Sequence, residues 1–218
     1  EWTEHNPMLG TRGVRLAVLR EGLYKMQARA ILGALEDVRA TGAVPHVEIM
    51  IPLVADPAEL ALVRSWVDEE VDASTESTLV GTMIETPRAA LAAGLVAAHA
   101  DFFSFGTNDL TQMGYALSRD DANSFLPDYI EQGILRDDPF VSIDKEGVGQ
   151  LVKMGAELGR KTRPRLQLGV CGEHGGDPQS VRFFAELGVD YVSCSPYRVP
   201  VARLAAAQAA ATSREESA

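Results

Sequence analysis

The sequence has few cysteines, no long apolar run and no excess of basic residues. Two cysteines among 218 residues cannot build a disulfide framework, so we expect a cytoplasmic protein. No apolar run approaches the ~20 residues of a membrane-spanning helix, and we expect no membrane partner. A formal net charge of −11 argues against a nucleic-acid partner. It still allows a small anionic ligand, because a few arginines in one cleft can create a local positive field.

The apolar residues gather in short runs that are continuous rather than alternating. Such runs predict parallel β-strands that are covered on both faces. They lie at residues 47–54, 79–85, 101–106, 166–171 and 189–195, with 12–18 as a possible sixth strand.

Helices are predicted between these strands. Four have a polar residue followed by proline, which indicates a helix start, at 56–59, 86–89, 177–180 and 195–198. A further helix is expected over about 21–41, ended by Gly42.

Repeated strand–helix units with short connections predict an α/β fold with a parallel sheet. No glycine pattern of the dinucleotide-binding type follows a strand, which favours a (β/α)8 barrel of TIM type over a doubly wound sheet. Five or six strands fall short of eight. We expect one domain over residues 1–218, because no linker divides the chain. The long polar segment 117–144 predicts a functional loop or short extra helices.

Polar side chains stand at the C-terminal ends of the predicted strands, where parallel-sheet enzymes place their active sites. Glu85 ends one strand, and Asn108 and Asp109 follow another. Two carboxylates at one strand edge repel each other unless a cation lies between them. Oxygen ligands favour Mg²⁺ or Mn²⁺. The alternative is that Glu85 and Asp109 only cap the helices that follow them.

Several residues near these carboxylates can bind an anion. Gly106 and Thr107 precede a predicted helix, whose first backbone N–H groups can bind an anion. Arg12 and Arg119 can grip a carboxylate or phosphate, although Arg119 can also pair with an acidic neighbour. Arg29 has two interpretations of equal weight, a site residue or a surface ion pair.

Cys171 stands between an apolar run and the glycine-rich turn 172–176. Free cysteines on apolar strands are most often inert packing, and Cys194 fits that description. The turn after Cys171 has no bulk to cover it, so the thiol can act as a proton donor to a carbon next to an enolate. Glu173 and His174 either orient this thiol or anchor its loop.

Beyond these patterns, several motifs resemble the phosphoenolpyruvate-utilising enzymes, and within them the C-terminal phosphoenolpyruvate/pyruvate domain of pyruvate phosphate dikinase. They are NPMLGTRGVRL, MQARAI, EIMIPLV, GTMIETPRAAL, FFSFGTNDLTQMGYALSRDD, GVCGEHGGDPQSV and YVSCSPYRVPVARLAAAQ, spread from Asn6 to Gln208.

This resemblance implies a phosphotransferase barrel that interconverts phosphoenolpyruvate and pyruvate and exchanges the phosphoryl group with a phosphohistidine on another domain. It implies Mg²⁺ as cofactor, with Glu85 and Asp109 as its ligands, and Cys171 as the general acid/base. By the same resemblance, the substrate is bound by Glu85 and Asp109 together with Arg12, Gly106, Thr107, Asn108 and Arg119.

The motifs also depart from the complete family pattern. Nothing in the chain resembles an ATP-grasp or phosphohistidine domain, so the chain alone is not expected to turn over ATP. Family barrels begin roughly two strands upstream of residue 6, so we expect an incomplete barrel that covers its exposed strand edges, for example as a homodimer. A Mg²⁺-dependent 2-oxo acid aldolase or lyase and an inactive dimerisation module stay open as alternatives.

Overall fold

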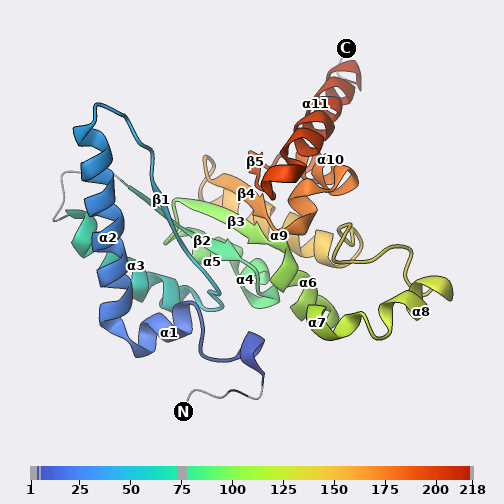
Figure 1. Ribbon diagram of the computed structural model, residues 1–218, viewed down its shortest axis with the longest axis horizontal. Helices are drawn as coiled ribbons and strands as arrows, with labels where there is room; N and C mark the ends of the chain where they lie inside the picture. The colour runs from blue at the N-terminus through green and yellow to red at the C-terminus, as the bar shows by residue number, and fades with distance from the viewer. Residues whose placement is uncertain (1–3, 5, 73–77, 217–218) are drawn as a thin grey trace.

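A five-stranded parallel sheet forms the centre of the protein (Figure 1). The computed structural model describes residue 4 and residues 6–72 and 78–216. The strands pair in sequential order, β1-β2-β3-β4-β5, and each of the five predicted apolar runs contains one of them. They are β1 (Glu48–Ile51), β2 (Leu79–Ile84), β3 (Phe102–Gly106), β4 (Gln167–Cys171) and β5 (Tyr191–Val192).

The predicted sixth strand over 12–18 is wrong, because residues Val14–Leu19 form helix α1. Gly13 begins this helix with φ 55°, a left-handed conformation that glycine adopts without strain. The N–H of Val14 donates to the carbonyl of Pro52, which places this turn at the C-terminal end of β1. A short apolar run does not by itself distinguish a strand from a buried helix.

The strand order favours a barrel-type sheet. In a doubly wound sheet the order reverses at a switch point, whereas here each strand pairs with its neighbour in sequence. Among the described residues the sheet has five strands, with β1 and β5 at its two ends. The eight-stranded closed barrel therefore stays a prediction.

Helices and short 3-10 turns connect the strands. Three of the four predicted proline-marked starts begin α3, α4 and α10, and the fourth begins the 3-10 turn η3. Segment 117–144 contains two short helices, as predicted. The elements are η1 (Pro7–Leu9), α1 (Val14–Leu19), α2 (Glu21–Ala40), α3 (Pro57–Asp72), α4 (Pro87–Leu91), α5 (Ala93–Ala97), α6 (Thr107–Tyr115), α7 (Arg119–Ala122), α8 (Leu126–Glu131), α9 (Val148–Thr162), η2 (Glu173–Gly176), α10 (Pro178–Glu186), η3 (Pro196–Arg198) and α11 (Val199–Glu216).

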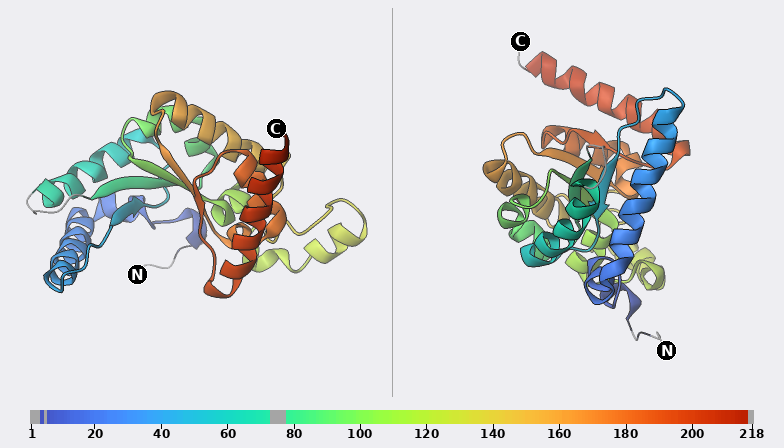
Figure 2. Two further views of the ribbon diagram at one scale, coloured as in Figure 1. Left: turned by 90° about the horizontal axis from the view of Figure 1, so that it is seen from above. Right: turned by 90° about the vertical axis from the view of Figure 1, so that its left-hand side faces the viewer.

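One face of the sheet is covered by α3, α5 and α9, while α2 and α11 stand at its two sides (Figure 2). The core between sheet and helices contains Phe103 and Phe105 of β3, both fully buried. Helix α9 approaches them closely at two glycines: a Cβ on Gly155 would lie 2.8 Å from the Phe105 ring, and one on Gly159 2.8 Å from the Phe103 ring. Small residues at these positions therefore set the distance between helix and sheet.

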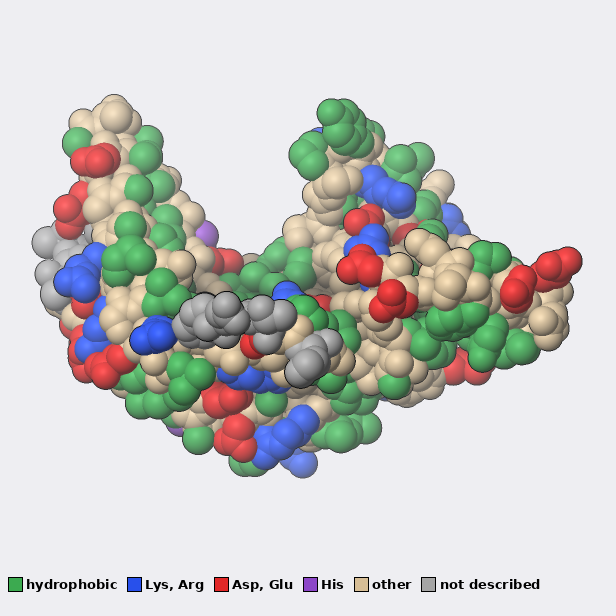
Figure 3. All heavy atoms as spheres, turned by 60° about the horizontal axis from the view of Figure 1, so that its bottom comes forward, with side chains coloured by type: hydrophobic (Ala, Val, Ile, Leu, Met, Phe, Trp, Pro, Cys, Tyr) green, Lys and Arg blue, Asp and Glu red, His purple; other side chains and the backbone are tan. Residues whose placement is uncertain are grey.

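The projecting ends of α2 and α11 leave a hollow between them, visible on the face shown in Figure 3. None of the helices in the described part of the chain combines the length and hydropathy needed to cross a membrane.

Asp101 stabilises the edge of the sheet at the N-terminal ends of the strands. Asp101 accepts hydrogen bonds from Arg64 (2.7 Å), Arg163 (2.8 Å) and the N–H of Val80 (3.0 Å). Burial alone would raise the pKa of Asp101, but the bonds from the two arginines and Val80 outweigh it and lower the pKa. This edge is therefore built for stability, and the candidate chemistry lies at the opposite edge.

Candidate active site

Glu85 lies at the end of β2 and is 4% exposed. Its carboxylate accepts a hydrogen bond from the backbone N–H of Leu53 at 2.7 Å. Leu53 follows β1 with φ 59°, an uncommon conformation for a leucine, and it aims this N–H at Glu85. Helix α4 is capped by Thr86, whose hydroxyl accepts from the N–H of Ala89. The alternative that Glu85 only caps the next helix is therefore wrong.

Asp109 lies in the first turn of α6 and reaches the carboxyl group of Glu85 within hydrogen-bonding range. Burial, together with the charge of Asp109, raises the pKa of Glu85 to about 8, and Arg12 opposes the shift. The N-cap position of α6 is Gly106, not Asp109. The structure thus brings together the two carboxylates that the sequence predicted as a pair.

Gln112 holds Asp109 and was not predicted from the sequence. Its Nε2 donates to Asp109 Oδ1 at 2.9 Å, and its Oε1 accepts from the backbone N–H of Arg119 at 2.9 Å. One amide side chain thereby connects a predicted metal ligand to the start of α7. A glutamine three residues after an aspartate on a helix is the only sequence signal for this bond.

Arg12 lies in the turn that precedes α1, and its charge lowers the pKa of Glu85. A Cβ on Gly13 would lie 2.9 Å from Leu53 Cβ, so the turn packs directly against the residue that donates to Glu85. The strand predicted over 12–18 does not form, so Arg12 precedes helix α1 instead of beginning a strand. Its charge acts on Glu85, and its membership of the site stays a prediction.

Arg29 forms an ion pair with Glu70 and not with the carboxylates of the candidate site. Its Nε lies 3.4 Å from Glu70 Oε2, and the arginine side chain is 64% exposed. Of its two interpretations, the structure supports the surface ion pair.

Cys171 ends β4 beside the two carboxylates. Its thiol lies 3.6 Å from the carbonyl oxygen of Phe105. Burial raises the pKa of the thiol, and the charges of Glu85 and Asp109 raise it further. Three residues separated by up to 86 positions thus meet at one strand edge, and the thiol is protonated near neutral pH.

Ser104 and Tyr191 interact with the Cys171 thiol and were not predicted from the sequence. Interaction with the Ser104 hydroxyl lowers the pKa of both Cys171 and Tyr191, against the effect of burial. The Tyr191 ring passes directly over Gly169, where an added Cβ would meet ring atoms at 2.1 Å. The sequence contains a signal for Ser104, which is a single hydroxyl side chain among apolar neighbours in FFSFG. A lone polar residue in a buried strand needs a hydrogen-bond partner.

The glycine-rich turn packs onto the start of α6. Gly172 has φ 105°, and an added Cβ would lie 2.9 Å from Thr107 Oγ1 and 3.0 Å from Asn108 Oδ1. Only a glycine fits both this conformation and this contact. Asn108 Oδ1 accepts from the N–H of Glu173 at 3.3 Å, which leaves its amide NH₂ free to donate elsewhere. Close approach to α6 therefore explains why glycine follows the cysteine.

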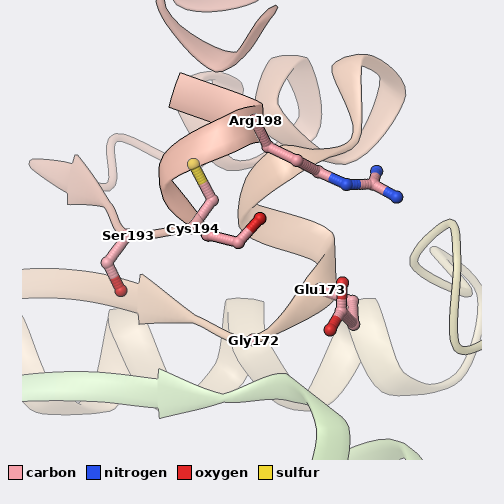
Figure 4. Close-up of a pocket in the computed structure, with 6 residues that line it drawn as sticks. Gly172, Glu173, Ser193, Cys194 and Arg198 are labelled. Carbon is pink, nitrogen blue, oxygen red and sulfur yellow. The ribbon is translucent and has the colours of Figure 1, made fainter. Parts of the chain in front are cut away.

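Arg119 pairs with Glu173 rather than with its acidic neighbours, at 3.5 Å. Both side chains line a hollow of about 400 Å³ together with Arg198. Figure 4 shows that Arg198 extends from η3 toward the side of the turn that carries Glu173, while Cys194 points away from Glu173. A second arginine at this mouth was not predicted.

The carboxylate pair fits Mg²⁺ better than a transition metal. Among the described residues, no three His, Cys, Asp or Glu side chains gather in a group that could hold a metal ion. Mg²⁺ is commonly bound by one or two carboxylates, with water and substrate oxygens completing its shell. Burial of Glu85 and the charge of the partly exposed Asp109 raise the pKa of Glu85, the effect expected of two neighbouring carboxyl groups.

The comparisons with known proteins identify the family of the chain. The family model described as the PEP-binding domain of PEP-utilising enzymes matches residues 1–211. The chain belongs to this family. Two curated relatives of this chain are "Pyruvate, phosphate dikinase, chloroplastic" of Mesembryanthemum crystallinum, 57% identical over 94% of this chain, and "Pyruvate, phosphate dikinase" of Clostridium symbiosum, 54% identical over 96%. The resemblance to pyruvate phosphate dikinase is thereby confirmed.

The matched region covers 22% and 25% of these two relatives, so the chain spans about a quarter of their length. A citrate lyase from Burkholderia xenovorans is a structural neighbour, with a TM-score of 0.54, 16% identity, and coverage of 84% of this chain and 53% of its own. At that identity the likeness supports the fold alone.

Proposed function

We propose that this chain forms a phosphoenolpyruvate/pyruvate site and that a phosphohistidine on another domain exchanges the phosphoryl group with it. The observation that carries the proposal is the meeting of Glu85, Asp109 and the Cys171 thiol at one strand edge. Membership of the PEP-utilising family supports the substrate class.

Glu85 and Asp109 are the residues that would hold Mg²⁺. When bound, Mg²⁺ would supply positive charge that stabilises the enolate form of the substrate. Arg12, Arg119 and the side-chain amide of Asn108 would bind the anionic groups of the substrate. The backbone N–H groups at the start of α6, from Gly106 and Thr107 onward, would add further donors.

Cys171 would move the proton. Transfer of the phosphoryl group from phosphoenolpyruvate to the phosphohistidine domain leaves pyruvate enolate, and the Cys171 S–H gives its proton to the methylene carbon. The raised pKa keeps the thiol protonated for this direction. In the reverse direction the thiolate takes a proton from the methyl group of pyruvate. Ser104 and Tyr191 would return the proton to the sulfur, since the Ser104 hydroxyl interacts with both Cys171 and Tyr191.

Proton exchange at pyruvate tests this role without ATP or a phosphohistidine. With Mg²⁺ in deuterated water, the chain should accelerate the exchange of the pyruvate methyl protons, measured by proton NMR. Cys171→Ala should abolish the acceleration while calorimetry still detects binding of Mg²⁺ and oxalate, an enolate mimic. A variant that keeps the full exchange rate removes Cys171 from the chemistry and favours the aldolase or lyase, which needs no thiol. Failure of the wild-type chain to bind oxalate favours the inactive module.

We further propose a homodimer in the cytoplasm. Support for the dimer comes from apolar side chains exposed on α11, namely Val199, Val201 and Leu204. Support for a reducing compartment comes from Cys171 and Cys194, which are both free. Size-exclusion chromatography with light scattering measures the assembly, and a compact monomer at micromolar concentration would contradict the dimer.

A further inference from the structure

His174 is fully buried and joins three segments that lie far apart in the sequence. Its Nδ1 lies 2.7 Å from the hydroxyl oxygen of Thr107 at the start of α6. Its Nε2 lies 2.8 Å from the carbonyl oxygen of Pro139, in the segment that follows α8. His174 itself belongs to η2, the turn that begins two residues after Cys171. A single imidazole therefore connects the cysteine turn, α6 and the segment around Pro139.

The two partners fix the form of the ring. A carbonyl oxygen only accepts, so the ring carries its proton on Nε2 and donates to Pro139. Burial lowers the pKa of His174, which favours the neutral ring. Nδ1 of the neutral ring then accepts the proton of the Thr107 hydroxyl. The same hydroxyl also donates to the carbonyl oxygen of Cys171, 3.0 Å away. Its single proton is therefore shared between Nδ1 of His174 and this carbonyl, and Thr107 contacts the turn at both residues.

The position of the turn relative to α6 depends on this pair. Gly172 packs onto Thr107 and Asn108 with no room for a side chain, so a shift of Thr107 would move the backbone next to Cys171. The segment around Pro139 has anchors of its own: Ser142 donates to Asp177 at 3.0 Å, and the N–H of Ile143 donates to Ser180 at 2.9 Å. The contact with Pro139 orients the ring, while the contact with Thr107 acts on the cysteine.

We propose that His174 is a positioning residue for proton transfer by Cys171: its Nδ1 shares the Thr107 hydroxyl proton with the carbonyl oxygen of Cys171 and so orients the hydroxyl that fixes the cysteine turn on the start of α6. This inference deepens the function proposed above and rests on it. The side chain does not touch the substrate in this account, and the Thr107 contact, rather than burial of the ring, carries the effect.

Three substitutions separate the two hydrogen bonds. His174→Asn places a carbonyl oxygen near the position of Nδ1 and keeps an acceptor for Thr107. His174→Gln places an amide N–H near the position of Nε2 and keeps the donor to Pro139. His174→Phe keeps a ring and loses both. The measurements are pyruvate methyl exchange, Mg²⁺–oxalate affinity, thermal unfolding, and the rate of Cys171 alkylation by iodoacetamide relative to Cys194.

We expect the Asn variant to exchange protons within about threefold of the wild-type rate, and the Gln and Phe variants to lose about tenfold, the effect of one hydrogen bond. Oxalate affinity should change by less than about threefold in all of them. Alkylation of Cys171 relative to Cys194 should rise about fivefold or more in the Gln and Phe variants only, as expected for a released turn.

If the exchange rate falls equally in the Asn and Gln variants, in proportion to their loss of thermal stability, His174 has only a structural role and the proposal is overturned. Unchanged exchange and alkylation in the Gln variant also overturn it. Should the Phe variant not fold, the Asn and Gln pair decides. If the wild-type chain binds oxalate without exchanging protons, the proposed chemistry of Cys171 fails, and the alkylation ratio still tests whether His174 positions the turn.

Discussion

The carboxyl groups of Glu85 and Asp109, from the end of β2 and the first turn of α6, lie within hydrogen-bonding range of each other. Burial and this neighbour raise the pKa of Glu85 to about 8. The pair is therefore costly in the metal-free protein and becomes favourable once a cation neutralises it.

The cost of this pair should appear in the pH dependence of stability. Glu85 is protonated in the folded chain up to about pH 8 but ionises near 4.5 when unfolded. The folded state thus binds more protons in this window, and the free energy of unfolding falls as pH rises through it. Urea titrations without Mg²⁺ measure the free energy of unfolding across this pH window. Its fall with rising pH should be smaller in Glu85→Gln than in the wild-type chain, by roughly 1–3 kcal/mol.

Glu85→Gln is a conservative test because an amide oxygen can still accept from the N–H of Leu53. Addition of Mg²⁺ at pH 8 should stabilise the wild-type chain and leave Glu85→Gln unchanged, since the variant lacks one of the two carboxylates. Parallel pH profiles for the two proteins would show that the pair does not control the titration.

Gln112 should control metal affinity through Asp109. Gln112→Met keeps the length of the side chain and removes both of its hydrogen bonds, to Asp109 and to the N–H of Arg119. We expect Mg²⁺-dependent oxalate affinity to fall about tenfold, the usual effect of losing a residue that orients a metal ligand. Calorimetry measures this affinity, and Gln179→Met on the exposed face of α10 is the matched control. An equal change in both variants would argue against a specific role.

Glu173 should compete with the substrate for Arg119. The two side chains form a partly exposed pair at 3.5 Å, so its loss should alter stability by less than about 1 kcal/mol. Glu173→Gln frees the arginine, and phosphoenolpyruvate affinity should rise about two- to fivefold. Asp120→Asn removes the same charge from the same hollow without breaking this pair. A similar rise in that variant would indicate a general charge effect instead.

The strands and most helix starts could be predicted from the sequence because their signals are local. Thr86 and Asp177, for example, each precede a proline and each cap the helix that follows. Residues 12–18 were misjudged because a short apolar run suits either a strand or a buried helix, and the contact of Val14 with Pro52 decides between them.

The candidate site divides in the same way. Glu85, Asp109 and Cys171 could be predicted because parallel strands bring their C-terminal ends to one edge. The role of His174 could not be, because its partner Thr107 lies 67 residues away and no local pattern encodes that distance. Ser104 gave a local signal, a single hydroxyl in an apolar strand, but its partners come from two other strands.

The most direct test of the central claim is protection of the thiol. Cys171 and Cys194 are both partly accessible, so their alkylation by iodoacetamide can be followed in one sample by peptide mass spectrometry. Mg²⁺ and oxalate together should slow the modification of Cys171 by about tenfold and leave Cys194 unchanged, and Glu85→Gln or Asp109→Asn should remove this protection. If Mg²⁺ and oxalate bind by calorimetry while Cys171 reacts at its unprotected rate, the thiol and the two carboxylates do not share one site.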